Sequence, residues 1–132
     1  MINYGKQSVD QNDIRAVIKV LKGNWLTQGP QVKKFENMLN KKFGAKYSTV
    51  LSSGTAALHL AAIALGWKKN DIILTTPISF LATSNCILYC QATPVFVDVD
   101  KNYFNIDVIK LEQTIISYKK KGKKISGIKA VL

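Results

Sequence analysis

The chain has few of the residues that bind metals, and this scarcity narrows the kinds of site it can hold. Its 132 residues include 2 cysteines and 1 histidine. Cys86 and Cys90 lie four residues apart in a stretch that we expect to be helical, and His59 is the only histidine. This set does not make a plausible zinc site. We therefore predict no metal site and interpret both cysteines as small hydrophobic residues of the core.

Arginine is also scarce, although the chain is strongly basic. The net charge is +11, yet Arg15 is the only arginine among 19 basic residues. Recognition of bases and phosphates usually uses the bidentate fork of arginine. The lysines are spread along the chain apart from a run at 119–124, which we interpret as a solvated loop. A basic nucleic-acid-binding module, which needs arginine and aromatic residues on one face, is therefore a weaker alternative.

Long hydrophobic runs are absent as well. No charge-free stretch reaches the length of a membrane span, and the N-terminus lacks the basic and then apolar layout of a secretory signal. We therefore expect a cytoplasmic protein. The hydrophobic content of 47% suffices for one core. The chain ends in an apolar run at 130–132, which predicts truncation within a strand.

Two predicted amphipathic helices open the chain, over 10–21 and 32–43. Strands and helices then alternate, a pattern that is typical of an α/β fold with a mainly parallel sheet and flanking helices. The expected order is strand 47–51, helix 55–65 ending at Gly66, strand 71–75, helix 79–90, strand 94–98, helix 107–117, and the beginning of a strand at Ile128.

The run at 51–58 joins an expected strand to a helix of small residues through Ser52, Ser53, Gly54 and Thr55. The first N–H groups of a helix have no internal partner and can donate to an anion, helped by the helix dipole. Glycine at this point leaves room for an anion to approach the backbone. The run therefore predicts a phosphate site, although serine and threonine at a helix start are also ordinary N-caps.

Two aromatic residues lie where a ligand could reach them. Phe80 follows the second expected strand, and we place it in the first turn of the next helix, at the same sheet edge as Gly54. It could stack on a planar ring or belong to the core. Trp25 lies in the loop at 23–30, which is either a substrate loop or a structural loop anchored by this tryptophan.

Asp98 and Asp100 follow the third expected strand and could hold a divalent ion in a metal-dependent glycosyltransferase. Turn and cap interactions explain the cluster better, because Asp107 can cap the next helix. His59 lies in a stretch that is apolar all round, so we expect a buried helix and a hydrogen-bonded core histidine.

Together these motifs resemble the DegT/DnrJ/EryC1/StrS family of sugar aminotransferases, which depend on pyridoxal 5'-phosphate (PLP) and have the aspartate aminotransferase fold. The resemblance implies that residues 1–132 form the N-terminal part of a fold type I large domain. The N-terminal helices and substrate loop would occupy 1–45, and the alternating cofactor-binding segment 46–132. The segments that carry the resemblance, in order, are 25–30, 52–58, 75–85 and 94–100.

The resemblance also implies roles for particular residues. Phe80 would stack on the pyridine ring of PLP. The Schiff-base lysine, and the aspartate that pairs with the pyridinium nitrogen, would lie beyond residue 132, so no lysine of this chain is assigned that role. The cofactor phosphate would be bound by Ser53, Gly54 and Thr55, and the sugar-nucleotide side would be lined by Tyr4, Asn24, Trp25, Leu26, Thr27 and Gly54.

The segments 76–80, 85–90 and 105–107 are most similar to the pseudaminic-acid branch of the family. This similarity implies amination at C4 of a UDP-linked 4-keto-6-deoxy-N-acetylhexosamine by ping-pong transamination, with glutamate as the amino donor. It also implies a homodimer whose partner chain completes the active site. The 132 residues alone are expected to be inactive.

Overall fold

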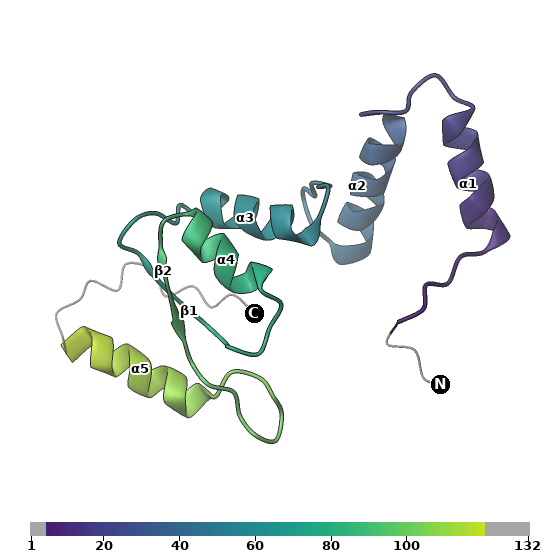
Figure 1. The fold of residues 1–132 in the computed structure, drawn as a ribbon. Coiled ribbons are helices and arrows are strands. Elements are labelled where there is room, and N and C mark those ends of the chain that lie inside the picture. Colours follow the sequence, from purple (N-terminus) through teal and green to yellow (C-terminus); the bar gives the residue numbers. More distant parts are fainter. Residues whose placement is uncertain (1–4, 121–132) are drawn as a thin grey trace. The chain divides into compact units, whose positions relative to one another are not determined.

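A computed structural model describes residues 5–120. The chain divides into two compact units, Met1–Val50 and Leu51–Leu132 (Figure 1). None of the helices within 5–120 is long and apolar enough to cross a membrane.

The first unit contains the two predicted amphipathic helices, α1 (Gln11–Leu21) and α2 (Pro30–Phe43). Helix α1 begins with a capping box, in which the Asp10 side chain accepts from the N–H groups of Asn12 and Asp13, and the Asp13 side chain accepts from the N–H of Asp10. Helix α2 has Pro30 at its start, where the missing N–H costs nothing. Both helices are therefore specified by their local sequence.

The second unit contains α3 (Gly54–Ala64), β1 (Ile72–Thr75), α4 (Ala82–Tyr89), β2 (Thr93–Phe96) and α5 (Val108–Lys120). Strands β1 and β2 pair in parallel, with Ile72 opposite Thr93 and Thr75 opposite Phe96. Helix α4 forms the crossover between them and packs against both strands and against α3 (Figure 1). The predicted α/β fold is confirmed.

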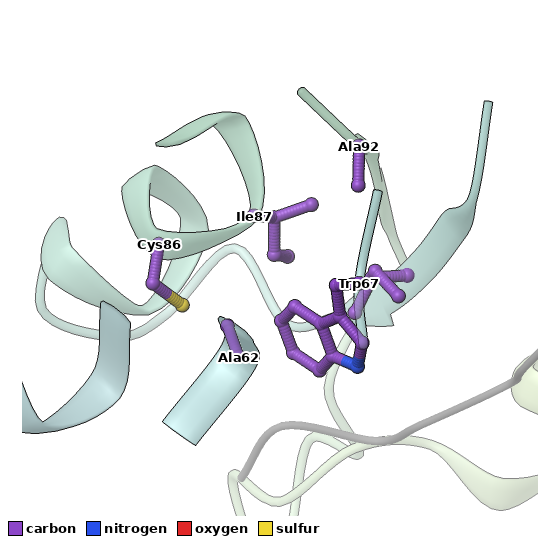
Figure 2. Close-up of a cluster of buried hydrophobic side chains, with 6 residues drawn as sticks. Ala62, Trp67, Cys86, Ile87 and Ala92 are labelled. Carbon is purple, nitrogen blue, oxygen red and sulfur yellow. The ribbon is translucent and has the colours of Figure 1, made fainter. Parts of the chain in front are cut away.

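The core of this unit lies between α3, α4 and the two strands. Figure 2 shows Cys86 and Ile87 of α4 directed towards Ala62 of α3 and towards Trp67. Ile73 and Ile87 have no exposed surface. Cys86 is buried, as predicted, and burial raises the pKa of its thiol, whereas Cys90 is half-buried beside the cluster. The members of the cluster are Ala62, Trp67, Ile73, Cys86, Ile87 and Ala92.

Two sequence predictions about strands and loops do not hold as stated. Residues 47–51 form no strand, because none of the described residues pairs with them, and a strand exists only through hydrogen bonds to a neighbour. The lysine run does not begin as a loop, since Lys119 and Lys120 belong to α5. The strand expected to begin at Ile128 and the rest of the lysine run, 121–124, lie outside the described residues.

The prediction that α3 is buried on all sides is also wrong. Ala62 is its only buried residue, whereas Leu60 and Ile63 are exposed, because α4 is the only described element that packs against this helix. His59 is half-buried and its ring meets that of Tyr89 edge to face, at 5.1 Å between centroids. An aromatic contact with α4 thus replaces the expected environment of a core histidine.

Candidate functional site

The start of α3 has the geometry of an anion-binding helix terminus. The Ser53 hydroxyl accepts a hydrogen bond from the N–H of Ala56 at 3.1 Å, so Ser53 is the N-cap. The N–H groups of Gly54 and Thr55, the first two residues of the helix, have no intrahelical carbonyl to which they can donate. Ser53 can still donate its hydroxyl hydrogen to a ligand. Capping and phosphate binding are therefore compatible at this residue.

Gly54 gives this helix start its accessibility. A Cβ atom built on Gly54 would find no heavy atom within 4 Å. Ser52, Ser53, Gly54 and Thr55 are all exposed. A small anion can therefore reach the free N–H groups without displacing any described residue, and the positive end of the helix dipole favours it. The residues present fit the phosphate of PLP.

Phe80 lies in the turn between β1 and α4, two residues before the helix begins, and not in the first helical turn as predicted. The reason is local. The Thr83 N–H donates to the carbonyl of Phe80 at 2.9 Å, and the Ser79 hydroxyl pairs with that of Thr83 at 2.8 Å. These bonds tie Ser79 and Phe80 to the first turn of α4 without making them helical. The Phe80 side chain is 77% exposed in the structure, which argues against the core interpretation.

A cavity of about 190 Å³ lies beside this turn. Phe80 lines it together with Phe96, the last residue of β2. Four of the other lining residues carry hydroxyl groups. They are Thr76, Ser79, Thr83 and Ser84. Because β1 and β2 are parallel, the turn after β1 and the end of β2 meet at the carboxyl edge of the sheet, where α/β proteins bind their ligands.

Apart from Gly54, the residues expected on the substrate side lie in the first unit. Asn24, Trp25, Leu26 and Thr27 are exposed in the loop between α1 and α2, and Tyr4 lies outside the described residues. Burial does not anchor Trp25, whose side chain is 66% exposed. The loop folds back on itself instead, since a Cβ on Gly29 would come within 3.0 Å of the Trp25 Cβ. Leu26 lines a cavity of about 690 Å³ with Val17, Val20 and other residues of α1 and α2.

The carboxylates after β2 make structural interactions. Asp98 accepts a hydrogen bond from the Lys110 ammonium at 2.7 Å. This bond lowers the pKa of the Asp98 carboxyl, and Asp98 in turn raises the pKa of Lys110. Asp100 accepts from the backbone of the following turn, and Asp107 accepts from the N–H groups of Ile109 and Lys110 at the start of α5. The predicted turn and cap roles are confirmed.

Residues 5–120 contain no group of three or more histidine, cysteine, aspartate or glutamate side chains placed to hold a metal ion. The glycosyltransferase alternative would use Asp98 and Asp100 for such an ion. In the described structure one of these carboxylates is bonded to an ammonium and the other to backbone N–H groups. The geometry therefore favours the phosphate and ring-stacking residues over the carboxylates as the functional site.

Sequence reasoning missed two interactions. The Ser79–Thr83 hydroxyl pair had a signal, since the two residues are four apart on either side of a helix start. The ion pair of Lys110 with Asp98 spans twelve residues and depends on how α5 folds back after β2, which the local sequence does not reveal.

Comparison with known proteins identifies the family of the chain. Residues 7–129 match the model of the DegT/DnrJ/EryC1/StrS aminotransferase family. The chain is 47% identical over 116 residues to UDP-4-amino-4,6-dideoxy-N-acetyl-beta-L-altrosamine transaminase of Campylobacter jejuni, covering 88% of this chain and 30% of that protein.

Two solved structures have the same fold over most of the chain. One is Helicobacter pylori PseC, an aminotransferase involved in the biosynthesis of pseudoaminic acid. It has a TM-score of 0.78 and 38% identity over 84% of this chain and 30% of its own. The other is GDP-4-keto-6-deoxymannose-3-dehydratase with a trapped PLP-glutamate geminal diamine, with a TM-score of 0.78 and 32% identity over 84% of this chain and 31% of its own.

The chain thus spans about 30% of the length of these relatives. Within that span the agreement in sequence and in fold extends over both helices of the first unit and the alternating elements of the second. The chain belongs to the DegT/DnrJ/EryC1/StrS aminotransferase family.

Proposed function

We propose that these residues are the N-terminal part of a PLP-dependent aminotransferase that acts on a nucleotide-linked keto-sugar. The sugar we propose is a UDP-linked 4-keto-6-deoxy-N-acetylhexosamine, aminated at C4 with glutamate as the donor, for the synthesis of pseudaminic acid or a related surface glycan. The observation that carries the proposal is the accessible start of α3 at Gly54, in a chain whose family is established. Its similarity to the Campylobacter transaminase supports the choice of sugar.

In this proposal the start of α3 binds the cofactor phosphate. Gly54 and Thr55 donate their N–H groups, and the Ser53 and Thr55 hydroxyls add donors, so each oxygen of the phosphate can accept charge-assisted hydrogen bonds. Phe80 stacks on the pyridine ring and fixes its plane. When bound, PLP supplies the electron sink for transfer of the amino group. The lysine that anchors it is proposed to lie in the part of the protein beyond residue 132.

The loop between α1 and α2 is proposed to bind the sugar nucleotide. Trp25 and Leu26 offer exposed apolar surface, and Asn24 and Thr27 offer hydrogen-bonding groups beside them. This mixture is typical of loops that bind ligands. Tyr4 and Gly54 complete the proposed substrate side.

We further propose that the whole protein is a cytoplasmic homodimer. Leu60 and Ile63 of α3 are exposed within the described structure, and a partner subunit would remove this apolar surface from water. Analytical ultracentrifugation of the whole protein tests this part of the proposal, which a monomer would contradict.

The experiment that tests the proposed activity uses the whole protein, PLP, glutamate and the UDP-linked 4-keto-sugar. We expect the cofactor absorbance band to shift when glutamate is added, and we expect the product mass to show exchange of the keto oxygen for an amino group. Loss of water from the sugar would instead indicate a dehydratase, the activity named for one of the similar structures. No spectral shift with glutamate would contradict transamination.

A further inference from the structure

Two hydroxyl groups hold the turn that carries Phe80. The Ser79 and Thr83 hydroxyl oxygens are 2.8 Å apart, and the Thr83 N–H donates to the carbonyl of Phe80 at 2.9 Å. Thr83 is 7% exposed and its own carbonyl accepts the thiol of the buried Cys86, so it is fixed to the core. Thr83 therefore ties both Ser79 and Phe80 to the rigid part of the second unit.

Helix capping does not explain this use of the hydroxyls. Serine near a helix start usually accepts from a free N–H of the first turn. Here α4 begins at Ala82, its N-cap residue Leu81 makes no side-chain cap, and the Ser79 hydroxyl is bonded to another side chain. The adjacent Ser84 hydroxyl does not bond to the free N–H groups either. It donates to the carbonyl of Leu81 at 3.0 Å. The bonds hold the turn in place and leave the helix terminus uncapped.

The residue held in this way is a large aromatic, Phe80, which is 77% exposed in the described structure. A fixed backbone adds little stability to an exposed phenylalanine that contacts nothing. A binding residue gains more, because a ring that is already oriented loses less conformational entropy when a ligand stacks on it. Phe80 also borders the cavity at the carboxyl edge of the sheet, whose wall includes Ser79 and Thr83.

We propose that Ser79 and Thr83 are positioning residues that set the direction of the Phe80 ring for stacking on the planar ring of the cofactor. This inference rests on the proposed function, since Phe80 needs a ring to stack on. In this proposal the two hydroxyls act without contacting the cofactor. Both act through Phe80, Ser79 by its side chain and Thr83 by its side chain and its N–H.

The test measures the affinity of the whole protein for pyridoxamine 5'-phosphate, which binds without a covalent bond to lysine. Ser79→Ala and Thr83→Val remove the hydroxyl pair, and each is expected to weaken binding roughly fivefold, the effect of one neutral hydrogen bond. Thr83→Ser keeps a hydroxyl and is expected to restore wild-type affinity. Thr114→Ala is the matched control, because it removes a hydroxyl of α5 that donates to the carbonyl of Lys110 and does not line the cavity beside Phe80.

A double-mutant cycle separates positioning from general stability. In a Phe80→Leu background there is no aromatic ring to orient, so Ser79→Ala is expected to have no further effect on affinity. Equal losses in both backgrounds would overturn the inference, as would unchanged affinity in Ser79→Ala. Failure of the wild-type protein to bind pyridoxamine 5'-phosphate would instead overturn the proposed function, and the inference with it.

A second measurement needs no cofactor. Amide hydrogen exchange at Thr83, whose N–H is bonded to Phe80, reports how often the turn opens. We expect faster exchange at this amide in Ser79→Ala than in wild type or in Thr114→Ala, which changes a hydroxyl of α5. Equal exchange in all three proteins would show that the hydroxyl pair does not hold the turn, and would overturn the inference.

Discussion

At the scale of single residues, Gly54 and Gly66 are expected to respond to alanine in opposite ways. A Cβ meets no atom at either site, but Gly66 has φ +75°, a conformation that alanine adopts only with strain. We expect Gly66→Ala to lower the free energy of unfolding by about 1 kcal/mol and to leave phosphate binding unchanged. Gly54→Ala should keep the stability and weaken pyridoxamine 5'-phosphate binding about tenfold, because the methyl group enters the space beside the free N–H groups.

Urea unfolding and cofactor titration of the two variants check this contrast. Each variant serves as the control for the other, since both exchange an exposed glycine at one end of α3 for alanine. A Gly54→Ala protein that bound the cofactor as wild type does would contradict the phosphate site.

The ion pair between Asp98 and Lys110 predicts a pH dependence at residue scale. The folded pKa of Asp98 is lowered by the hydrogen bond from Lys110, so its contribution to stability is present above the ordinary aspartate value of 3.8 and is lost as pH falls through the folded pKa. The folded pKa of Lys110 is raised, so its contribution is present below the ordinary lysine value of 10.5 and is lost as pH rises through the folded value. The pair therefore stabilises the fold between these limits.

Both groups are exposed to solvent, so the contribution is small and decreases with salt. NMR titration of the Asp98 carboxyl in Lys110→Met is expected to show a pKa that returns towards the ordinary value. Lys119→Met, in the last turn of the same helix, is the control and should leave the titration of Asp98 as in wild type. An Asp98 pKa that Lys110→Met does not raise would contradict the pairing.

At the scale of helices and strands, the sequence predicted correctly those helix ends that are marked by capping, proline or glycine residues. The capping box at Asp10, Pro30 at the start of α2 and Gly66 after α3 place helix ends close to where the sequence predicts them. The expected strand at 47–51 did not form, because pairing depends on a neighbouring chain segment that no local pattern supplies. Sequence therefore predicts helix ends better than strand pairing in this chain.

Helix α5 offers a test of such a local signal. The Asp107 side chain accepts from the N–H groups of Ile109 and Lys110, both at 3.0 Å. We expect Asp107→Ala to destabilise the helix by about 1 kcal/mol, the usual cost of losing an N-cap. Faster amide exchange at the start of α5 is the measurement. Asp107→Asn, which keeps an oxygen acceptor, should behave nearly as wild type, and equal protection in the alanine variant would contradict the cap.

At the scale of the whole molecule, the site could be predicted only in part. Phe80, Gly54 and Thr55 were proposed as cofactor residues because each follows an expected strand or lies at a helix start; all three are exposed in the structure, and their roles remain predictions. The turn around Phe80 was placed wrongly because α4 begins at Ala82 and not at 79, and the Ser79 hydroxyl bonds to the Thr83 side chain ahead of the helix start. The loop at 24–27 remains a prediction, since its role depends on a sugar nucleotide and on how the two units are arranged.

The two units also differ in how their residues are buried, and this predicts a difference in local stability. In the described structure, α1 and α2 contain no buried residue, whereas β1 and α4 contain Ile73 and Ile87, which are fully buried. Amides protected by a buried core exchange only when large parts of the fold open, and amides of exposed helices exchange through local opening.

Hydrogen exchange of the 132-residue chain should therefore be fast over 11–43 and slow over 72–89. If the whole protein covers the apolar faces of α1 and α2, the same amides should exchange more slowly there. Equal protection of both segments in the isolated chain would contradict the assignment of its core to the second unit.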